Sequence, residues 1–199
     1  MSIKAVLWDF SGVLFIPIEG RGHNYYAQSL GLSSETLTKY YKDNLNRKLN
    51  LGEIDHKTFY RTMFKEQGIN EELLSLYEEV FYQSFQLNIP LVDRIKSIRK
   101  TKKVGLLSNY SNRLRPMLEN NLKIAGLFDE LIISCEVRMV KPDEAIYRLA
   151  LARLDVQPQE TIFVDDLIEN IEAAQKIGIH AIHFQNTAQV ISEVGQMLG

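Results

Sequence analysis

Short apolar runs recur along the chain and predict strands that are buried on both faces. Strands of a parallel sheet are apolar throughout because helices cover both sides. After residue 107 these runs alternate with helical patterns, which indicates a parallel sheet between two layers of helices, an α/β fold of three α/β/α layers. Five runs are predicted to be strands: residues 3–8, 103–107, 130–134, 161–164 and 181–184.

The segment between the first two predicted strands follows a different pattern and predicts helices only. One apolar helical face covers residues 59–64 and ends at Gly68, and a second covers residues 73–85. Tyrosine pairs near residues 25 and 40 indicate two more helices, and the aromatic side chains are expected to form the core between them. The sequence therefore predicts a core domain and an inserted helical domain, with boundaries at 1–15 plus 90–199 and at 16–89.

Composition and charge narrow the classes of function. The net charge of −2 gives no field that would attract nucleic acid or an anionic membrane. No apolar run approaches the roughly 18 residues of a membrane span, and the run before Asp9 is too short for a signal peptide. The single cysteine, Cys135, cannot form an internal disulfide, which suits a reducing compartment. We expect a cytoplasmic protein without nucleic-acid or membrane partners, either a monomer or a homodimer.

Polar residues stand where predicted strands end, which is where open parallel sheets bind ligands. Asp9 follows the first strand and has a glycine three residues later, which allows a tight turn beside the carboxylate. Each residue also has an ordinary explanation, because Asp9 suits a turn, Ser108 a helix cap and Lys141 the surface. The candidates are Asp9, Ser108, Asn109, Lys141, Asp165 and Asp166.

Taken together, these side chains suit an anionic ligand and a metal ion. Adjacent carboxylates beside a third form a hard oxygen site suited to magnesium. A hydroxyl and an amide at a strand end can hold a phosphate oxygen, and an ammonium group can balance its charge. Asp166 and Glu169 also fit a capping box, and Pro142 is expected in the first turn of a helix.

The order and spacing of these residues resemble the four-motif signature of the haloacid-dehalogenase superfamily. The resemblance covers essentially the whole chain, including residues 165–174, which are similar to the fourth motif of many members. It implies a Rossmann-like core and identifies residues 16–89 as a cap of the C1 type. It also implies a magnesium-dependent hydrolase, in most members a phosphatase of a small phosphorylated metabolite.

The resemblance assigns catalytic and phosphate-binding roles by position. Asp9 matches the nucleophile that forms an aspartyl-phosphate, and Lys141 matches the lysine that stabilises charge on the nucleophile and the phosphoryl group. Ser108 matches the phosphate-binding hydroxyl, with Asn109 in support and Ser11 beside the phosphate.

The resemblance also assigns the metal ligands. Asp166 aligns with the direct magnesium ligand of the fourth motif, and Asp165 with its acidic neighbour, a direct or water-mediated ligand. Asp9 and the backbone carbonyl of Ser11 complete the protein ligands. Bound magnesium would neutralise charge on the transferring group.

Ser11 departs from the pattern of most phosphatases in the superfamily, which carry aspartate there as general acid and base. Such a group contributes roughly 10²–10⁴-fold to the rate, and serine cannot replace it near neutral pH. Three alternatives follow: a phosphatase for good leaving groups or with a proton donor from the cap, a catalytically weak protein that binds a phosphorylated ligand, and phosphonate or dehalogenase chemistry. Phosphonate cleavage needs a cap lysine, and Lys42, Lys48, Lys57 and Lys65 are available.

Other side chains are weaker candidates for the site. Arg21 and His23 follow the first loop and could face the substrate or form part of a solvated loop. His56 is expected on the surface at a helix start, and His183 is expected away from the site. The sequence does not identify the substrate.

Overall fold

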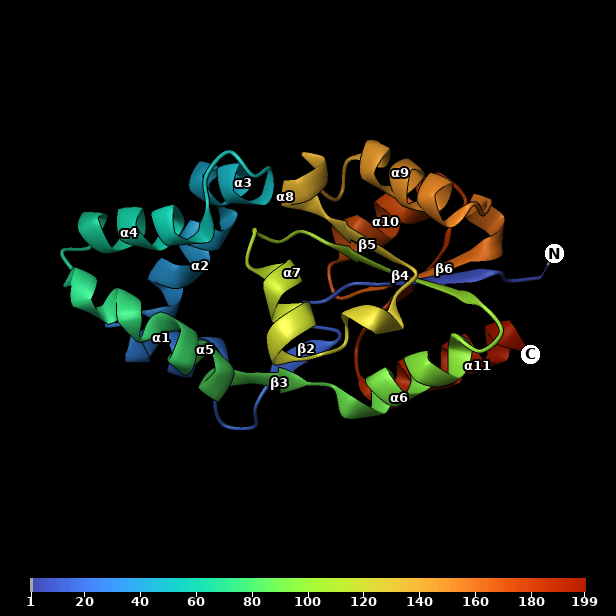
Figure 1. Cartoon of the computed structure of the whole chain (residues 1–199), viewed down its shortest axis with the longest axis horizontal. Helices are drawn as coiled ribbons and strands as arrows, with labels where there is room; N and C mark the ends of the chain where they lie inside the picture. Colours follow the sequence, from blue (N-terminus) through green and yellow to red (C-terminus); the bar gives the residue numbers. More distant parts are fainter. Residues whose placement is uncertain (1) are drawn as a thin grey trace.

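A five-stranded parallel sheet with helices on both faces forms one part of the protein, and a group of helices forms the other (Figure 1). The computed structural model describes residues 2–199. The strands are β1 (Ala5–Trp8), β4 (Lys103–Ser108), β5 (Glu130–Ile133), β6 (Thr161–Asp165) and β7 (His180–His183), in the order β5-β4-β1-β6-β7. This arrangement confirms the predicted fold class, and each strand lies within two residues of its predicted limits.

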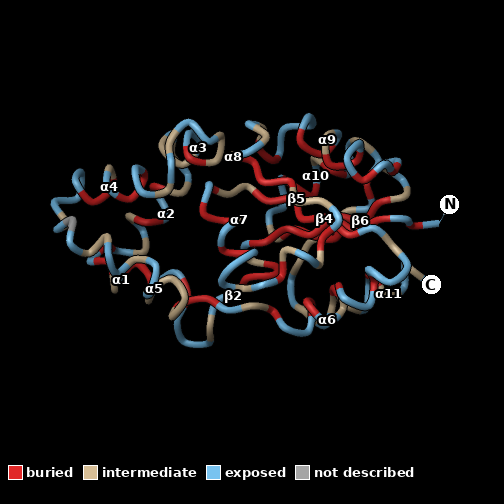
Figure 2. Tube along the Cα trace, in the orientation of Figure 1, coloured by how far each residue is buried: buried red, intermediate tan, exposed pale blue. Residues whose placement is uncertain are grey.

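Alternation along the strands assigns each face of the sheet to its own layer of helices. Ala5 and Leu7 pack with α9 (Glu144–Leu154) and α10 (Ile168–Lys176), while Trp8 belongs to the larger core on the opposite face. That opposite face is covered by α6 (Ile89–Ile98) and α11 (Thr187–Leu198) (Figure 1). Buried residues therefore lie along the strands and on the inward sides of the helices (Figure 2).

Residues 18–84, called the helical segment below, lie beyond the carboxyl ends of the strands (Figure 1). Several of its helices begin at side-chain caps, as in α4, where Asp55 accepts a hydrogen bond from the backbone N–H of Thr58. Its buried aromatic residues belong to the same core as one face of the sheet. The helices are α1 (His23–Ser29), α2 (Ser34–Lys42), α3 (Asn44–Asn50), α4 (His56–Glu66), η1 (Glu71–Ser75) and α5 (Tyr77–Ser84).

Two short strands bracket the helical segment, and the sequence did not predict them. β2 (Phe15–Pro17) and β3 (Phe85–Leu87) pair as an antiparallel ribbon, so the chain leaves and re-enters the core side by side. The helix expected over residues 73–85 is instead η1 followed by α5, and Phe85 belongs to β3. Three-residue strands are too short to produce a recognisable alternation.

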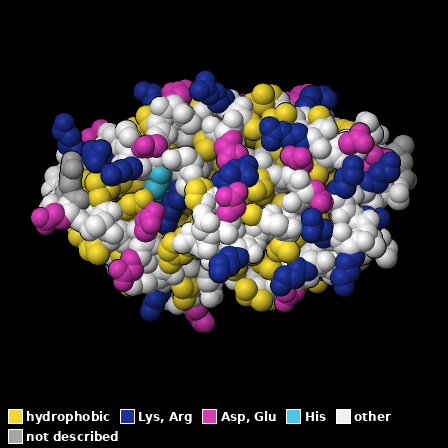
Figure 3. Space-filling model, viewed as in Figure 1, with side chains coloured by type: hydrophobic (Ala, Val, Ile, Leu, Met, Phe, Trp, Pro, Cys, Tyr) yellow, Lys and Arg dark blue, Asp and Glu magenta, His cyan; other side chains and the backbone are white. Residues whose placement is uncertain are grey.

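The remaining short elements follow β4, β5 and α9. They are α7 (Leu114–Pro116), η2 (Met117–Asn121), η3 (Ala125–Leu127), α8 (Ser134–Val137) and η4 (Pro158–Glu160). Acidic and basic side chains are interspersed on the face seen in Figure 3, without a large patch of one sign. In the described part of the chain, no helix is both long and apolar enough to cross a membrane.

Gly105 lets α9 approach the centre of the sheet, and a larger residue there should destabilise the fold. A Cβ atom at Gly105 would lie 2.7 Å from Leu7 Cδ2 and 3.0 Å from Leu154 Cδ1. Gly105→Val should lower the free energy of unfolding by about 1–3 kcal/mol through overpacking. Gly126→Val is the control, because nothing lies within 4 Å of its Cβ position. Equal denaturant midpoints for the two variants would contradict this account of the packing.

Candidate active site

The strand register brings Asp9 and Asp165 to the same level at the carboxyl edge of the sheet. Trp8 is paired with Val164, so the next residue on each strand lies beside the other. The backbone N–H of Asp9 donates to the carbonyl of Val164 at 2.9 Å, which fixes the chain at the point where β1 ends. Both carboxylates are buried, with relative exposures of 5% for Asp9 and 0% for Asp165.

Lys141 joins these two carboxylates. Its Nζ lies 2.8 Å from Asp9 Oδ1 and 2.6 Å from Asp165 Oδ2, and the lysine is itself buried. Asn109 holds the lysine backbone from both sides, since its Nδ2 donates to the Lys141 carbonyl and its Oδ1 accepts from the Lys141 N–H, each at 2.8 Å. Asn109 thus orients the lysine, and both polar groups of its side chain are occupied by this role.

Asp165 is surrounded by donors. In addition to Lys141, its carboxylate accepts from the Leu167 N–H at 2.8 Å and from Asn170 Nδ2 at 3.0 and 3.1 Å. The predicted capping box is wrong, because the residue before α10 is Leu167 and no side chain caps that helix. Asp165 accepts from the Leu167 N–H, which is not the Glu169 N–H that a capping box at Asp166 would use. Pro142 lies two residues before α9, outside the helix in which it was expected.

Asp166 reaches the same cluster from beyond β6. One oxygen from each of Asp9, Asp165 and Asp166 lies within 4.8 Å of the others, close enough for one metal ion. The Asp166 carboxylate packs over Gly12, whose φ of 80° is in the left-handed region that favours glycine. Of the three carboxylates, Asp165 has its oxygens occupied by protein donors, which leaves Asp9 and Asp166 more available to a metal.

The charges of this cluster do not balance within the protein. Three carboxylates face one ammonium group, so two negative charges remain when all four groups are ionised. Burial raises the pKa of Asp9 to about 7 despite the opposing effect of Lys141. Burial and the neighbouring Asp165 raise the pKa of Asp166 to about 6. A divalent cation would neutralise this excess, and the all-oxygen donor set suits magnesium.

Ser108 contributes a buried hydroxyl to the site. It is the last residue of β4, and its Oγ has no hydrogen-bond partner among residues 2–199. A buried hydroxyl without a partner is costly unless a ligand completes it. It does not cap a helix, because α7 begins only at Leu114. Its position beside Asp9 in the cavity fits a phosphate oxygen as the missing partner.

Ser11 also lines the cavity, in the turn after β1. The turn is closed by a hydrogen bond from the Gly12 N–H to the Phe15 carbonyl, and Ser11 is exposed. No carboxylate is present at this position. This position therefore supplies no general acid for a leaving oxygen.

A cavity of about 710 Å³ lies between these residues and the helical segment. Its floor carries the charged groups Asp9, Lys141 and Asp166. The opposite part of the cavity, called the aromatic chamber below, is lined by rings from β2, β3, α2, α4 and α5. These rings are Phe15, Tyr41, Phe59, Tyr60, Phe81 and Phe85. The sequence had suggested only that such residues form a helical core, because helical periodicity cannot distinguish a buried face from a cavity wall.

Arg21, His23 and His183 lie in different surroundings. His23 lines the cavity, whereas Arg21 donates to the Gln83 carbonyl and lies over the Tyr25 ring. His183 was expected away from the site, yet its Nε2 lies 3.0 Å from the Asp166 carbonyl oxygen. The expectation was wrong because β7 ends at His183, beside the end of β6.

His56 begins α4 as predicted, but it is half-buried in the cavity wall rather than on the surface. Its Nε2 lies 3.4 Å from an Arg113 nitrogen and its Nδ1 lies 3.3 Å from Ser111 Oγ. Arg113 reaches from the loop after β4 and lies 4.2 Å from the centre of the Phe81 ring. Burial and the Arg113 charge lower the pKa of His56 to about 3, so it is neutral near pH 7.

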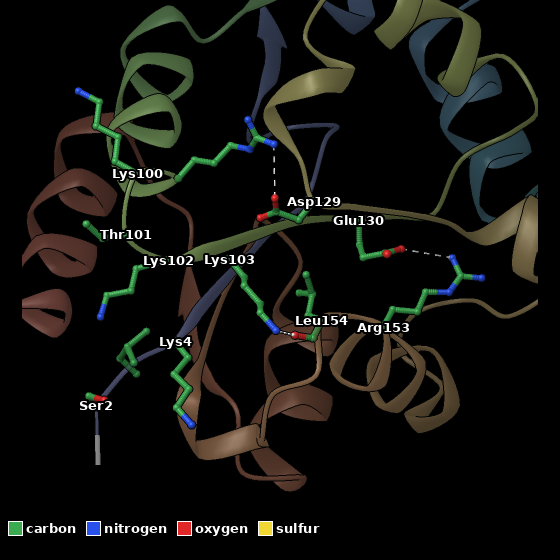
Figure 4. A pocket seen from close by; sticks show the side chains of 12 residues that line it. Ser2, Lys4, Lys100, Thr101, Lys102, Lys103, Asp129, Glu130, Arg153 and Leu154 are labelled. Carbon is green, nitrogen blue, oxygen red and sulfur yellow. Dashed lines mark hydrogen bonds and ion pairs between the residues drawn. The ribbon is translucent and has the colours of Figure 1, made fainter.

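A second hollow lies at the opposite, amino-terminal edge of the sheet, with Lys4, Lys103 and Glu130 among its lining residues (Figure 4). Several of its charges are paired locally, since Arg153 lies 4.0 Å from Glu130 and Lys103 lies 3.9 Å from Asp155. Its position away from the carboxylate cluster excludes it as part of the same site.

Comparison with known proteins agrees with this geometry. A model of the haloacid dehalogenase-like hydrolase family matches residues 3–178. The chain belongs to this family. A haloacid dehalogenase-family enzyme of Bacteroides thetaiotaomicron, solved with magnesium and inorganic phosphate, superposes with a TM-score of 0.74 at 19% identity. The superposition covers 95% of this chain and 99% of that chain.

Two curated relatives differ in how much of their length the chain matches. Mouse bifunctional epoxide hydrolase 2 is 24% identical over the whole chain, and the chain spans 39% of the length of that protein. The phosphorylated carbohydrates phosphatase of Thermotoga maritima is 26% identical over 97% of the chain and 92% of that protein. As a family member, the chain has the family's α/β fold.

Gly12→Ala should disturb the carboxylate cluster, with Gly20→Ala as the matched control. Both glycines have positive φ, so either substitution should cost roughly 1–2 kcal/mol of stability. A Cβ at Gly12 would lie 2.3 Å from Asp166 Oδ2, whereas nothing lies within 4 Å at Gly20. Only Gly12→Ala should weaken magnesium binding, by at least about tenfold in titration calorimetry. Equal affinities in the two variants would show that Asp166 does not contribute to a metal site.

Proposed function

We propose that the chain is a magnesium-dependent phosphatase of a small phosphorylated molecule, acting through an aspartyl-phosphate on Asp9. The observation that carries this proposal is the buried Lys141 ammonium, which contacts both Asp9 and Asp165 in a cluster with two excess negative charges. Similarity to the Thermotoga phosphatase and to the Bacteroides structure solved with magnesium and phosphate supports it.

In this proposal each side chain has a distinct role. A carboxylate oxygen of Asp9 attacks phosphorus, and the P–O bond to the leaving group breaks. Lys141 holds Asp9 in place and offsets charge on the transferring group, while the Ser108 hydroxyl binds a phosphate oxygen. Water then hydrolyses the aspartyl-phosphate and releases inorganic phosphate, which restores the Asp9 carboxylate.

Magnesium would be held by Asp9, Asp166 and the carbonyl of Ser11, and when bound it supplies charge neutralisation at the phosphoryl group. Asp165, which is occupied by Lys141, Leu167 and Asn170, acts in this proposal as a positioning residue.

The proposal divides the chain into a core of residues 1–15 and 90–199 and a cap of residues 16–89. The β2–β3 ribbon, where both chain crossings lie, supports this division. We place the protein in the cytoplasm, because Cys135 is a free thiol and suits a reducing compartment.

Phosphonate chemistry is less well supported than phosphate hydrolysis. It requires a cap lysine near the reacting atoms, and Lys141 is the only lysine among the described residues that line the cavity. The cap lysines Lys42, Lys48, Lys57 and Lys65 are all exposed. A protein that binds a phosphorylated ligand with little turnover remains the second candidate, because Ser11 supplies no acid or base.

Removal of the nucleophile should abolish phosphatase activity. Wild-type protein should hydrolyse 4-nitrophenyl phosphate with magnesium and lose activity in EDTA. Asp9→Asn should reduce kcat by at least about 10³-fold, because no carboxylate remains to attack phosphorus. Asp93→Asn, which alters an exposed carboxylate paired with Lys96, is the control and should retain activity. Turnover by Asp9→Asn, or turnover that is insensitive to EDTA, would reject the mechanism.

Ser11→Asp should restore a general acid and base. The gain should be largest for alkyl phosphates, whose leaving oxygen needs a proton, and smallest for 4-nitrophenyl phosphate. We expect kcat/KM for an alkyl phosphate to rise by about 10–10²-fold, part of the full contribution of such a group. Ser11→Asn controls for side-chain size. If Asp and Asn have the same effect, the position does not take part in proton transfer.

A further inference from the structure

The aromatic chamber gives the cavity an apolar upper half. Phe15 stacks with Phe81 at a centroid distance of 5.4 Å, and Phe81 lies 5.2 Å from Phe85, so these rings form a continuous wall. Tyr41 and Phe59 stack at 6.3 Å with their planes nearly parallel. A wall of this kind offers contact area and few hydrogen bonds to whatever is attached to the phosphate.

The charged lining residues lie at the other end of the cavity. Among the described residues that line it, those with charged side chains are Asp9, Lys141, Asp166 and Glu169, all in the core. The helical segment contributes no acidic or basic lining residue other than its histidines, again among described residues. His56 is neutral, and contacts with Ser111 and Arg113 occupy both ring nitrogens.

A polyhydroxylated organic group would fit this chamber poorly. Each hydroxyl that enters without a partner loses its hydrogen bonds to water. Apart from His56, the described lining residues of the helical segment that could bond a hydroxyl are His23, Asn46, Asn50 and the Tyr41–Tyr60 pair, few for the chain of hydroxyls in a sugar phosphate. The Asn46 amide also donates to the Tyr41 carbonyl at 2.7 Å, which reduces this supply further.

Three tyrosine hydroxyls at the chamber are hydrogen-bonded to one another in a way that leaves one hydroxyl hydrogen available to a ligand. The Tyr26 hydroxyl donates to Tyr60 at 2.8 Å, and the Tyr60 and Tyr41 hydroxyls are 3.1 Å apart. Three hydroxyl hydrogens serve two hydrogen bonds, so one remains, on Tyr41 or on Tyr60. Both of these line the cavity, whereas Tyr26 lies behind them and is fully buried. Burial raises the pKa of all three phenols well above the usual value, so they remain protonated donors.

We propose that the substrate is the phosphate monoester of a predominantly apolar alcohol, whose organic part fills the aromatic chamber and presents one hydrogen-bond acceptor to the Tyr41–Tyr60 hydroxyl pair. This inference rests on the proposed phosphatase function and adds the class of the leaving group. The alcohol carries a ring or branched hydrocarbon and no additional charge, because none of the described residues that line the chamber has a charged side chain.

The first test compares two primary alkyl esters that differ only in the organic part. Because 4-phenylbutyl phosphate and ribitol 5-phosphate share the same reacting bond, their kcat/KM ratio reports on the chamber. With wild-type protein, we expect kcat/KM for 4-phenylbutyl phosphate to be at least about 10²-fold higher than kcat/KM for ribitol 5-phosphate. A ratio of one, or a preference for ribitol 5-phosphate, overturns the proposal.

The second test removes the spare hydroxyl hydrogen. A Tyr41→Phe, Tyr60→Phe double variant keeps both rings, and Tyr25→Phe is the control because its hydroxyl bonds Gln83 outside the cavity. In wild-type protein and in Tyr25→Phe, the KM for 4-(4-methoxyphenyl)butyl phosphate should be about tenfold lower than the KM for 4-phenylbutyl phosphate, because the methoxy oxygen accepts the spare hydrogen. The double variant should lose this preference. An unchanged preference in the double variant rejects the role of the phenols.

Binding measurements separate failure of this inference from failure of the phosphatase function. Titration calorimetry on Asp9→Asn with the same two alkyl esters measures affinity without turnover. If no ester is hydrolysed but 4-phenylbutyl phosphate binds at least tenfold more tightly, the phosphatase function is wrong and the ligand class is retained. If 4-nitrophenyl phosphate is hydrolysed but the alkyl esters bind equally, the function holds and the ligand class is wrong.

Discussion

The arrangement of the site depends on the two ion pairs of Lys141, with Asp9 and with Asp165. The ammonium group contacts carboxylates at the ends of two neighbouring strands, β1 and β6, at 2.8 and 2.6 Å, in a position from which water is largely excluded. Removing either carboxylate would leave a buried charge without a partner, which is far more costly than losing an exposed pair. The parallel register, the hydrogen bonds from the Asn109 side chain to the Lys141 backbone and the donors around Asp165 hold this arrangement.

Much of the fold could be predicted from the sequence because buried parallel strands have a distinctive composition. The runs at β1 and β6 are fully buried and mostly apolar, with Asp9 directly after β1 and Asp165 at the end of β6, so both the sheet and its functional edge were predictable. β2 and β3 were not, since three residues show no periodicity, and Phe85 was assigned to the helix before it. Local propensity also failed before α10, where Leu167 precedes the helix and no side chain caps it, although Asp166 was expected to do so.

The candidate site was predictable only in part, for the same kind of reason. Residues that follow strands, such as Asp9 and Asp166, were identifiable because topology brings strand ends together. The chamber was not, because the rings at Phe59 and Tyr60 have the spacing of an ordinary helical core. His56 and His183 show the limit most clearly, as their neighbours Arg113 and Asp166 are distant in sequence and no local pattern connects them.

The loop after β4 serves two distant parts of the site. At one end Asn109 grips the Lys141 backbone, and at the other Asn112 accepts the first N–H of α4 while Arg113 lies against the Phe81 ring. So short a loop cannot move independently at its two ends. A ligand that displaces α4 or α5 would therefore also disturb the hydrogen bonds between Asn109 and the Lys141 backbone. Selection among ligands would then act on the speed of the chemical step, and not only on how tightly each ligand is held.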